Sequence, residues 1–200
     1  MRSFSRTLSS PAPLLHGRRL DQFSADWFAV QVWTGREHFC AAHLRARAYD
    51  VFLPCYQEQR RWSDRVKKTE RALFAGYVFC RIPPAATDKI ITTPGVIRIV
   101  SDQSGPLPVP AEEIDAIQRI LATRRPTEPW QFLQAGERVR LETGPLRGTE
   151  GVVLTIRNRH RLVVSVSLLQ RSVAVEIDPE WVTKSHPIGE PQIQARAQAT

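Results

Sequence analysis

The segment "VRLETGPLRGTEGVV" (residues 139–153) places two runs that favour strands on either side of a turn made from Thr-Gly-Pro and Leu-Arg-Gly. Gly144 and Gly148 can take the positive φ that a reversing chain needs, and Gly151 leaves room for another backbone to approach closely. β-branched valines dominate the second run. The stretch therefore predicts a strand, a tight loop and a second strand.

Short runs of this kind continue to residue 183. They are "ERVRL", "EGVVLTI", "RLVVSVSLL", "SVAVEI" and "WVT". An all-β unit this short buries a core only by curling into a small barrel. We therefore expect a small β-barrel over residues 135–184 and a disordered tail over residues 185–200. The density of valine favours a barrel that is stable as strands.

The first half of the chain alternates between strand and helix patterns. Strands are expected at "WFAVQVW" (27–33), "VFLPCYQEQ" (51–59), "LFAGYVFCRI" (73–82) and "VIRIV" (96–100), and helices at 36–48, 88–91 and in "PVPAEEIDAIQRILATRR" (108–125). This order matches the ferredoxin-like split βαβ arrangement with a helix added at its end. We expect an α+β protein with a ferredoxin-like α/β sandwich over residues 27–122.

Two segments lack any periodicity. Residues 1–26 are rich in Ser, Pro and Arg, and residues 123–134 hold Pro126 and Pro129. The first segment is typical of a disordered tail and the second of a linker between two domains.

The composition is that of a folded protein without a membrane segment. Hydrophobic residues make up 42% of the chain and charged residues 24%. No stretch approaches the roughly 20 apolar residues that cross a bilayer, and the amino-terminal segment lacks the apolar centre of a signal peptide. We expect a cytoplasmic monomer with no membrane partner.

The three cysteines, Cys40, Cys55 and Cys80, are widely spaced and form no CxxC pair. No histidine lies close enough in sequence to make a recognisable ligand cluster, and His38 and His43 do not have the i, i+4 spacing of two ligands on one helix face. We expect three buried thiols, no metal and no cofactor. The sequence also lacks a phosphate loop, a carboxylate pair and a nucleophile with a base, so we expect no enzyme activity.

The chain carries a formal charge of +8 and has a pI near 10.1, which favours acidic partners and nucleic acid above all. Half of this excess lies in "QRRWSDRVKKTER" (59–71). The candidate nucleic-acid contacts in this segment are Arg60, Arg61, Trp62, Arg65, Lys67 and Lys68. Cations with an aromatic among them suit phosphates and an unpaired base. The alternative is a solvated hairpin without a function.

The strand "FAGYVFCR" is apolar on both faces. Alternation places Phe74 with Val78 and Cys80 on one face, and Tyr77 with Phe79 on the other. The strand is therefore either central and covered on both sides, or it presents an aromatic patch to a partner.

The segment "GERVRLETGPLRGTEGVVLTI" resembles the KOW motif, a strand, loop and strand found in transcription and ribosomal proteins. Together with "VSVSLLQRSVAVEI" it resembles the carboxy-terminal domain of the NusG family, an SH3-like barrel. The segments "WFAVQV", "LFAGYVF", "TTPGVIRIV" and "PVPAEEI" follow in the order of that family's amino-terminal domain. The resemblance covers residues 27–184.

The resemblance implies a transcription elongation factor that binds the clamp helices of RNA polymerase, suppresses pausing and modulates termination. It assigns the polymerase-binding patch to Phe74, Tyr77 and Phe79. Simple alternation, in contrast, places Phe74 on the other face of the strand.

In the family, a loop of the KOW domain recruits ribosomal protein NusE or termination factor Rho. This loop matches Leu168, Leu169, Gln170 and Arg171. Gln170 stands where housekeeping members commonly carry glycine, which leaves the identity of the partner open.

The pair "RRWSDR" and "LFAGY" is similar to the operon-specific UpxY-like and RfaH-like branch. That similarity implies contact with the non-template DNA strand near the transcription bubble through His43 and the basic segment. The alternative for His43 is a partly exposed polar residue. The competing function is an RNA-binding or ribosome-associated KOW protein.

Overall fold

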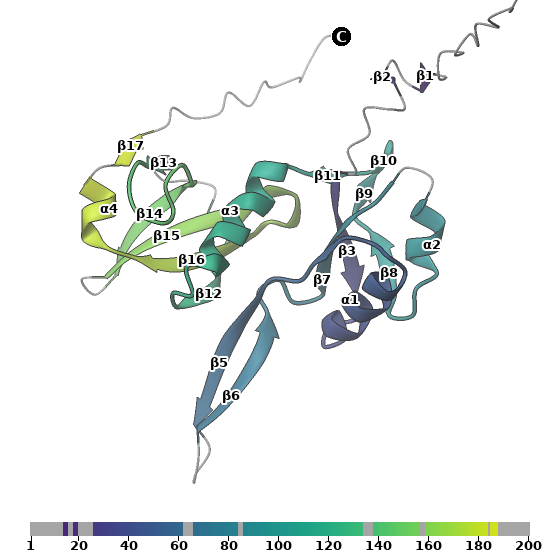
Figure 1. Cartoon of the computed structure of the whole chain (residues 1–200), viewed down its shortest axis with the longest axis horizontal. Coiled ribbons are helices and arrows are strands. Elements are labelled where there is room, and N and C mark those ends of the chain that lie inside the picture. Colours follow the sequence, from purple (N-terminus) through teal and green to yellow (C-terminus); the bar gives the residue numbers. More distant parts are fainter. Residues whose placement is uncertain are drawn as a thin grey trace, which may run out of the picture.

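The computed structural model describes residues 14–15, 18–19, 26–61, 66–83, 86–133, 138–156, 159–183 and 185–187. Trp62, Arg65 and most of the two predicted tails therefore lie outside the described residues. Within the first predicted tail, β1 (Leu14–Leu15) and β2 (Arg18–Arg19) form a short antiparallel pair. The remaining elements form two packed units and a projecting hairpin (Figure 1).

An antiparallel sheet forms the centre of the first unit. Its strands are β3 (Trp27–Val32), β4 (Val51–Phe52), β7 (Tyr77–Arg81), β8 (Val96–Ile99) and β11 (Pro108–Val109). β7 lies between β3 and β4, and β8 and β11 both pair with β3. The small pair β9 (Ser101–Asp102) and β10 (Gly105–Pro106) follows β8.

Helices cover both faces of this sheet. They are α1 (Glu37–Ala46), α2 (Thr87–Ile91) and α3 (Ala111–Ala122). α1 and α2 share a core with Val78 and Cys80, whereas α3 packs on the opposite face, which carries Phe79. Of the two alternatives for this strand, the structure shows the central one, in which both faces are covered.

The strand predicted over residues 73–82 begins only at Tyr77, because residues 73–76 form a turn. Gly76 has a φ of +83°, which favours glycine. The turn brings the Phe74 ring onto the face of Phe79, with ring centroids 5.4 Å apart. The alternation-based placement of Phe74 was therefore wrong, because alternation holds only within an extended strand.

The basic segment forms most of a long hairpin. β5 (Cys55–Arg61) pairs with β6 (Val66–Ala72), and the hairpin projects away from both units (Figure 1). The strand expected over residues 51–59 is interrupted at Pro54, which lies between β4 and β5, where the chain leaves the central sheet.

The second unit is one six-stranded antiparallel sheet with the order β12-β16-β15-β14-β13-β17. Its strands are β12 (Thr127–Trp130), β13 (Arg138–Leu141), β14 (Glu150–Ile156), β15 (Arg159–Val166), β16 (Arg171–Ile177) and β17 (Ser185–Pro187). β12 lies within the segment predicted to be a linker, which therefore contributes an edge strand to this sheet.

The predicted strand "WVT" is instead part of the short helix α4 (Pro179–Thr183). Proline in the first turn of a helix lacks only an N–H that would have no partner there. The N–H of Trp181 donates to the carbonyl of Asp178, 3.0 Å away, and closes this turn.

The turn over residues 142–149 joins β13 to β14. Gly144 and Gly148 both have a φ of +78°, as the turn chemistry predicts. The indole of Trp181 lies against Gly144, where an added Cβ would come within 2.4 Å of the ring. Leu146, in the middle of the turn, is buried in the core of the second unit.

No helix in the part of the chain that the structure describes has the length and apolar character that a membrane span requires.

Candidate functional site

The three residues of the predicted polymerase-binding patch gather on one face of the first unit. Phe74 and Phe79 are completely buried, and Tyr77 is half-buried at the edge of the same apolar cluster. The grouping agrees with the resemblance, but the patch is not exposed in this structure.

Side chains from the second unit complete the cover over this cluster. Val166 and Val173 have no exposed surface and belong to the same core as Phe74 and Phe79. Leu168 and Leu169 pack against it from the 3-10 turn that joins β15 to β16. The two units therefore share a continuous apolar core. Burial of each valine side chain stabilises this core by about 1.5–3 kcal/mol.

Two polar interactions reinforce the contact. The N–H of Ser167 donates to both carboxylate oxygens of Glu113 on α3, at 3.3 Å each. The guanidinium carbon of Arg171 lies 5.5 Å from the centre of the Tyr77 ring, within the range of a cation–π interaction. Burial raises the pKa of Glu113, and the hydrogen bonds from Ser167 offset part of that rise.

α3 belongs to both units. Ile114 and Ile117 face the aromatic cluster, whereas Ala116 and Ile120 enter the core of the second unit. Arg119 donates to the Thr149 hydroxyl, 3.4 Å away, next to the turn between β13 and β14. The helix α3 therefore packs against both units (Figure 1).

The predicted partner-binding loop, from Leu168 to Arg171, is the segment that docks on the first unit. Gln170 has a φ of +52°, the left-handed conformation that glycine adopts without strain. Its side-chain amide donates to the carbonyl of Ser167, 2.9 Å away. The two surfaces predicted for different partners thus cover each other.

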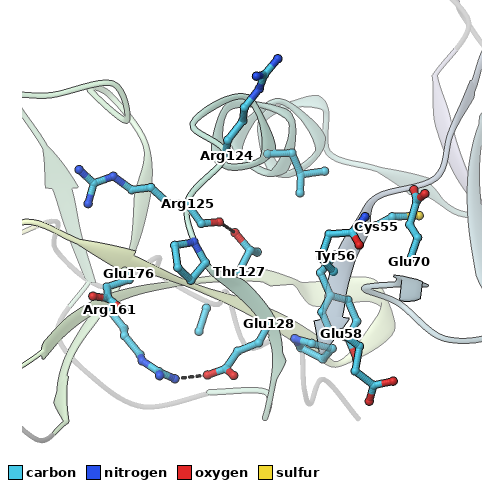
Figure 2. A pocket seen from close by; sticks show the side chains of 15 residues that line it. Cys55, Tyr56, Glu58, Glu70, Arg124, Arg125, Thr127, Glu128, Arg161 and Glu176 are labelled. Atoms are coloured by element: carbon cyan, nitrogen blue, oxygen red, sulfur yellow. Dashed lines mark hydrogen bonds and ion pairs between the residues drawn. The ribbon is translucent and has the colours of Figure 1, made fainter. Parts of the chain in front are cut away.

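A cleft of about 920 Å³ opens beside this contact, between the base of the hairpin and the second unit (Figure 2). Arginines and glutamates both line it, and Arg161 pairs with Glu128. Arg125 forms a two-point ion pair with Asp178 at 3.0 and 2.6 Å. This mixture of charges does not form a basic nucleic-acid groove.

The hairpin aligns part of the predicted nucleic-acid segment. Arg60 faces Lys67 across the two strands, and Lys68 is exposed one position further along. Like charges at facing positions destabilise a strand pair unless an anion neutralises them. The hairpin is therefore a candidate phosphate-binding element.

His43 lies on the exposed face of α1. Its ring meets the Phe39 ring edge-on at 4.3 Å, and the Arg36 guanidinium lies 5.7 Å from the same ring. Phe39 is 40% exposed, and Trp33, just before the helix, is 65% exposed. Sequence reasoning missed Trp33, Arg36 and Phe39, although the spacing 36, 39, 43 places a cation and two rings on one helix face.

Glu37 connects this helix to the turn that carries Phe74. Its side chain is buried, and its Oε1 accepts a hydrogen bond from the N–H of Gly76 at 2.8 Å. Burial by itself raises the pKa of Glu37, but hydrogen bonds from the backbone N–H groups of Gly76, Glu37 and Gly35 outweigh burial and leave the pKa below its ordinary value.

The cysteines only partly follow the prediction of three buried thiols. Cys40 and Cys80 are buried, whereas Cys55 is half-buried and lies 3.9 Å from His38 Nε2. The three cysteines are free thiols.

Comparison with known proteins finds one family that the chain resembles. The family model described as "Transcription termination factor nusG" matches residues 25–118. The "Transcription termination/antitermination protein NusG" of Helicobacter pylori is 28% identical over 173 residues, which cover 80% of this chain and 98% of that protein. The protein with the same description from Escherichia coli K12 is also 28% identical over 173 residues, with coverage of 80% and 96%.

Residues 25–118 thus match the NusG family, and the chain is similar to NusG proteins over 80% of its length. A solved structure described as "Domain interaction in Thermotoga maritima NusG" covers 82% of this chain and 97% of its own, with a TM-score of 0.50 and 22% sequence identity. That likeness supports the same overall fold.

Proposed function

We propose that this protein is a transcription elongation factor of the NusG family that binds the RNA polymerase clamp through Phe74, Tyr77 and Phe79. In this proposal the first unit is the family's ferredoxin-like domain and the second its SH3-like KOW barrel. The sheet order β8-β3-β7-β4 and the β13-turn-β14 unit support those assignments. Bound in this way, the factor suppresses pausing and modulates termination by favouring one state of the polymerase.

The observation that carries the proposal is the reciprocal cover of two surfaces. A cluster of Phe74, Tyr77 and Phe79 sits under the loop that the family uses for recruitment. Apolar surface on one unit that another unit covers is suited to a partner that competes for it. Polymerase binding through this patch therefore requires the second unit to move away.

Release of the second unit would also free Leu168, Leu169, Gln170 and Arg171. These residues are the proposed contact for ribosomal protein NusE or termination factor Rho. Because the same loop covers the clamp-binding patch, recruitment of that second partner is coupled to polymerase binding.

The non-template DNA strand near the bubble is the proposed nucleic-acid partner. The hairpin cations and the group Arg36, Phe39 and His43 provide charge and stacking faces for it. A role in the operon-specific branch of the family remains a proposal that rests on the similarity of "RRWSDR" and "LFAGY" to that branch.

The test is binding of the full chain to core RNA polymerase. The buried Phe79 is a poor site for mutation, so the half-buried Tyr77 is the better probe. We compare the wild type, a Leu168→Asp, Leu169→Asp variant that opens the interface, and the opened variant with Tyr77→Ala. Ile156→Asp is the matched control, because it adds a carboxylate to an exposed position of the same sheet.

We expect the opened variant to bind polymerase more tightly than the wild type, Tyr77→Ala to reverse that gain, and Ile156→Asp to match the wild type. If neither the wild type nor the opened variant binds polymerase, the proposal fails. Binding to ribosomes alone in the same assay would support the ribosome-associated KOW alternative, and binding to RNA alone the RNA-binding one.

A further inference from the structure

Three side chains with metal-binding atoms meet at the base of the hairpin. They are His38 on the first turn of α1, Cys55 at the start of β5 and Glu70 near the end of β6. One imidazole nitrogen, the thiol sulfur and one carboxylate oxygen all lie within 4.8 Å of one another. The three residues are distant in sequence, and only the fold brings them together.

The backbone positions explain why the side chains converge. Cys55 pairs with Ala72, and Gln57 pairs with Glu70, so Cys55 and Glu70 lie on the same face of the hairpin. Figure 2 shows the Cys55 sulfur beside the Glu70 side chain, where the two groups interact by a hydrogen bond. His38 approaches from α1, with its Nε2 atom 3.9 Å from the sulfur.

The distance between the Cys55 sulfur and the His38 Nε2 atom is close to that of a tetrahedral zinc site. Zinc binds thiolate sulfur at about 2.3 Å and imidazole nitrogen at about 2.0–2.1 Å, so the two ligand atoms are about 3.6 Å apart in a tetrahedron. The observed separation of 3.9 Å needs only a small side-chain adjustment. Thiolate and imidazole are also the ligands that zinc prefers over the oxygen ligands of magnesium or calcium.

The charges near the thiol favour a cation. A carboxylate oxygen of Glu70 lies within 4.8 Å of the Cys55 sulfur. The guanidinium of Arg45 donates to the carbonyl of Val51 at 3.2 Å. A divalent ion, one thiolate and one carboxylate together carry no net charge.

We propose that His38, Cys55 and Glu70 bind one Zn²⁺ ion, with water as the fourth ligand. On binding, the Cys55 thiol releases its proton to solvent and its sulfur coordinates the metal. The ion joins the base of the β5–β6 hairpin to α1, the two elements that carry the candidate nucleic-acid contacts. The inference does not depend on the proposed polymerase binding.

The experiment uses the full chain, stripped of metal with a chelator and dialysed. Zn²⁺ is titrated in competition with a chromophoric chelator, and Co²⁺ serves as a spectroscopic probe for a thiolate ligand. We expect one Zn²⁺ per chain and a thiolate-to-cobalt charge-transfer band. Hydrogen exchange at β5 and β6 should slow when Zn²⁺ is added.

His38→Ala and Cys55→Ser test the ligands, and His43→Ala is the matched control on the same helix. Each of the first two changes should weaken Zn²⁺ binding by more than about 100-fold, because loss of a direct ligand exceeds the 10–100-fold loss seen for outer-shell partners. His43→Ala should bind Zn²⁺ like the wild type. Circular dichroism establishes that each variant is folded.

The proposal is overturned if the wild type does not compete for Zn²⁺. It is also overturned if either His38→Ala or Cys55→Ser, when folded, binds Zn²⁺ as the wild type does, because the ion then lies elsewhere. A cobalt complex without the thiolate band would exclude Cys55 and overturn the assignment in the same way.

Discussion

At the scale of single residues, Gly144 and Gly148 have the same φ of +78° but different surroundings. A Cβ at Gly144 would lie 2.4 Å from the Trp181 ring, whereas at Gly148 its nearest neighbour would be the Arg119 side chain at 3.7 Å. Gly148→Ala therefore measures the cost of the backbone conformation alone, which is about 1–2 kcal/mol.

Gly144→Ala should cost at least about 1 kcal/mol more than Gly148→Ala, because it adds a steric clash to the same backbone strain. Denaturant unfolding of the full chain, followed by the fluorescence of the tryptophans, gives the two free-energy changes. Equal losses of stability would show that the Trp181 ring moves away without cost.

The lowered pKa of Glu37 predicts that the stability of the folded protein depends on pH. Its pKa in the folded protein lies below the ordinary value of 4.5, so the stabilisation is complete above that pH and disappears as the pH falls through the lower, folded pKa. Glu37→Gln should therefore destabilise the protein at neutral pH by about 1–3 kcal/mol.

The difference between Glu37→Gln and the wild type should shrink in acid. Thermal unfolding at neutral pH and below pH 4.5 measures it. Asp115→Asn on the exposed face of α3 is the control. A difference that stays constant with pH would contradict a role for the ionised carboxylate.

At the scale of elements, the β5–β6 hairpin is the proposed contact for single-stranded DNA, because it carries the basic segment. Lys68→Ala should weaken binding to single-stranded DNA and reduce the slope of log K against log salt by about 0.7, the value for one lost phosphate contact. Lys89→Ala, an exposed lysine on α2, removes the same charge from another surface. Equal effects of the two changes would show that the hairpin contributes only net charge to DNA binding.

α3 shows how one element can serve two cores. Ile114, Ile117 and Ile120 recur at helical spacing and form one apolar stripe on α3. In the structure that stripe is divided between the two units. A helical repeat identifies which side of the helix is buried but does not specify what buries it.

At the scale of the whole molecule, the docked arrangement rests on an apolar contact with a few polar bonds at its edge. The change Leu168→Asp with Leu169→Asp places two carboxylates against the aromatic cluster. Burying an unpaired charge is costly, so we expect the two units to separate while each keeps its strands.

Small-angle X-ray scattering of the full chain should show a larger radius of gyration for this variant than for the wild type. Ile156→Asp should leave the radius unchanged. An unchanged radius in the double variant would mean that α3 and β12 hold the two units together without the loop.

The amino-acid sequence by itself determined the order of elements, the turn glycines and the family resemblance, because these depend on local backbone preferences and on patterns along the chain. It also placed Phe74, Tyr77 and Phe79 in one predicted patch, through the resemblance. The start of β7, the strand in the predicted linker and the helix at α4 differed, because neighbouring segments decide where a short element begins or whether it forms.

Only the tertiary structure decided what covers the aromatic cluster and what surrounds Cys55. The loop from Leu168 to Arg171 meets Tyr77 across about ninety residues of chain, and His38, Cys55 and Glu70 converge from three elements. Such contacts depend on how the two units and the hairpin pack in three dimensions. No periodicity or spacing in the sequence carries that information.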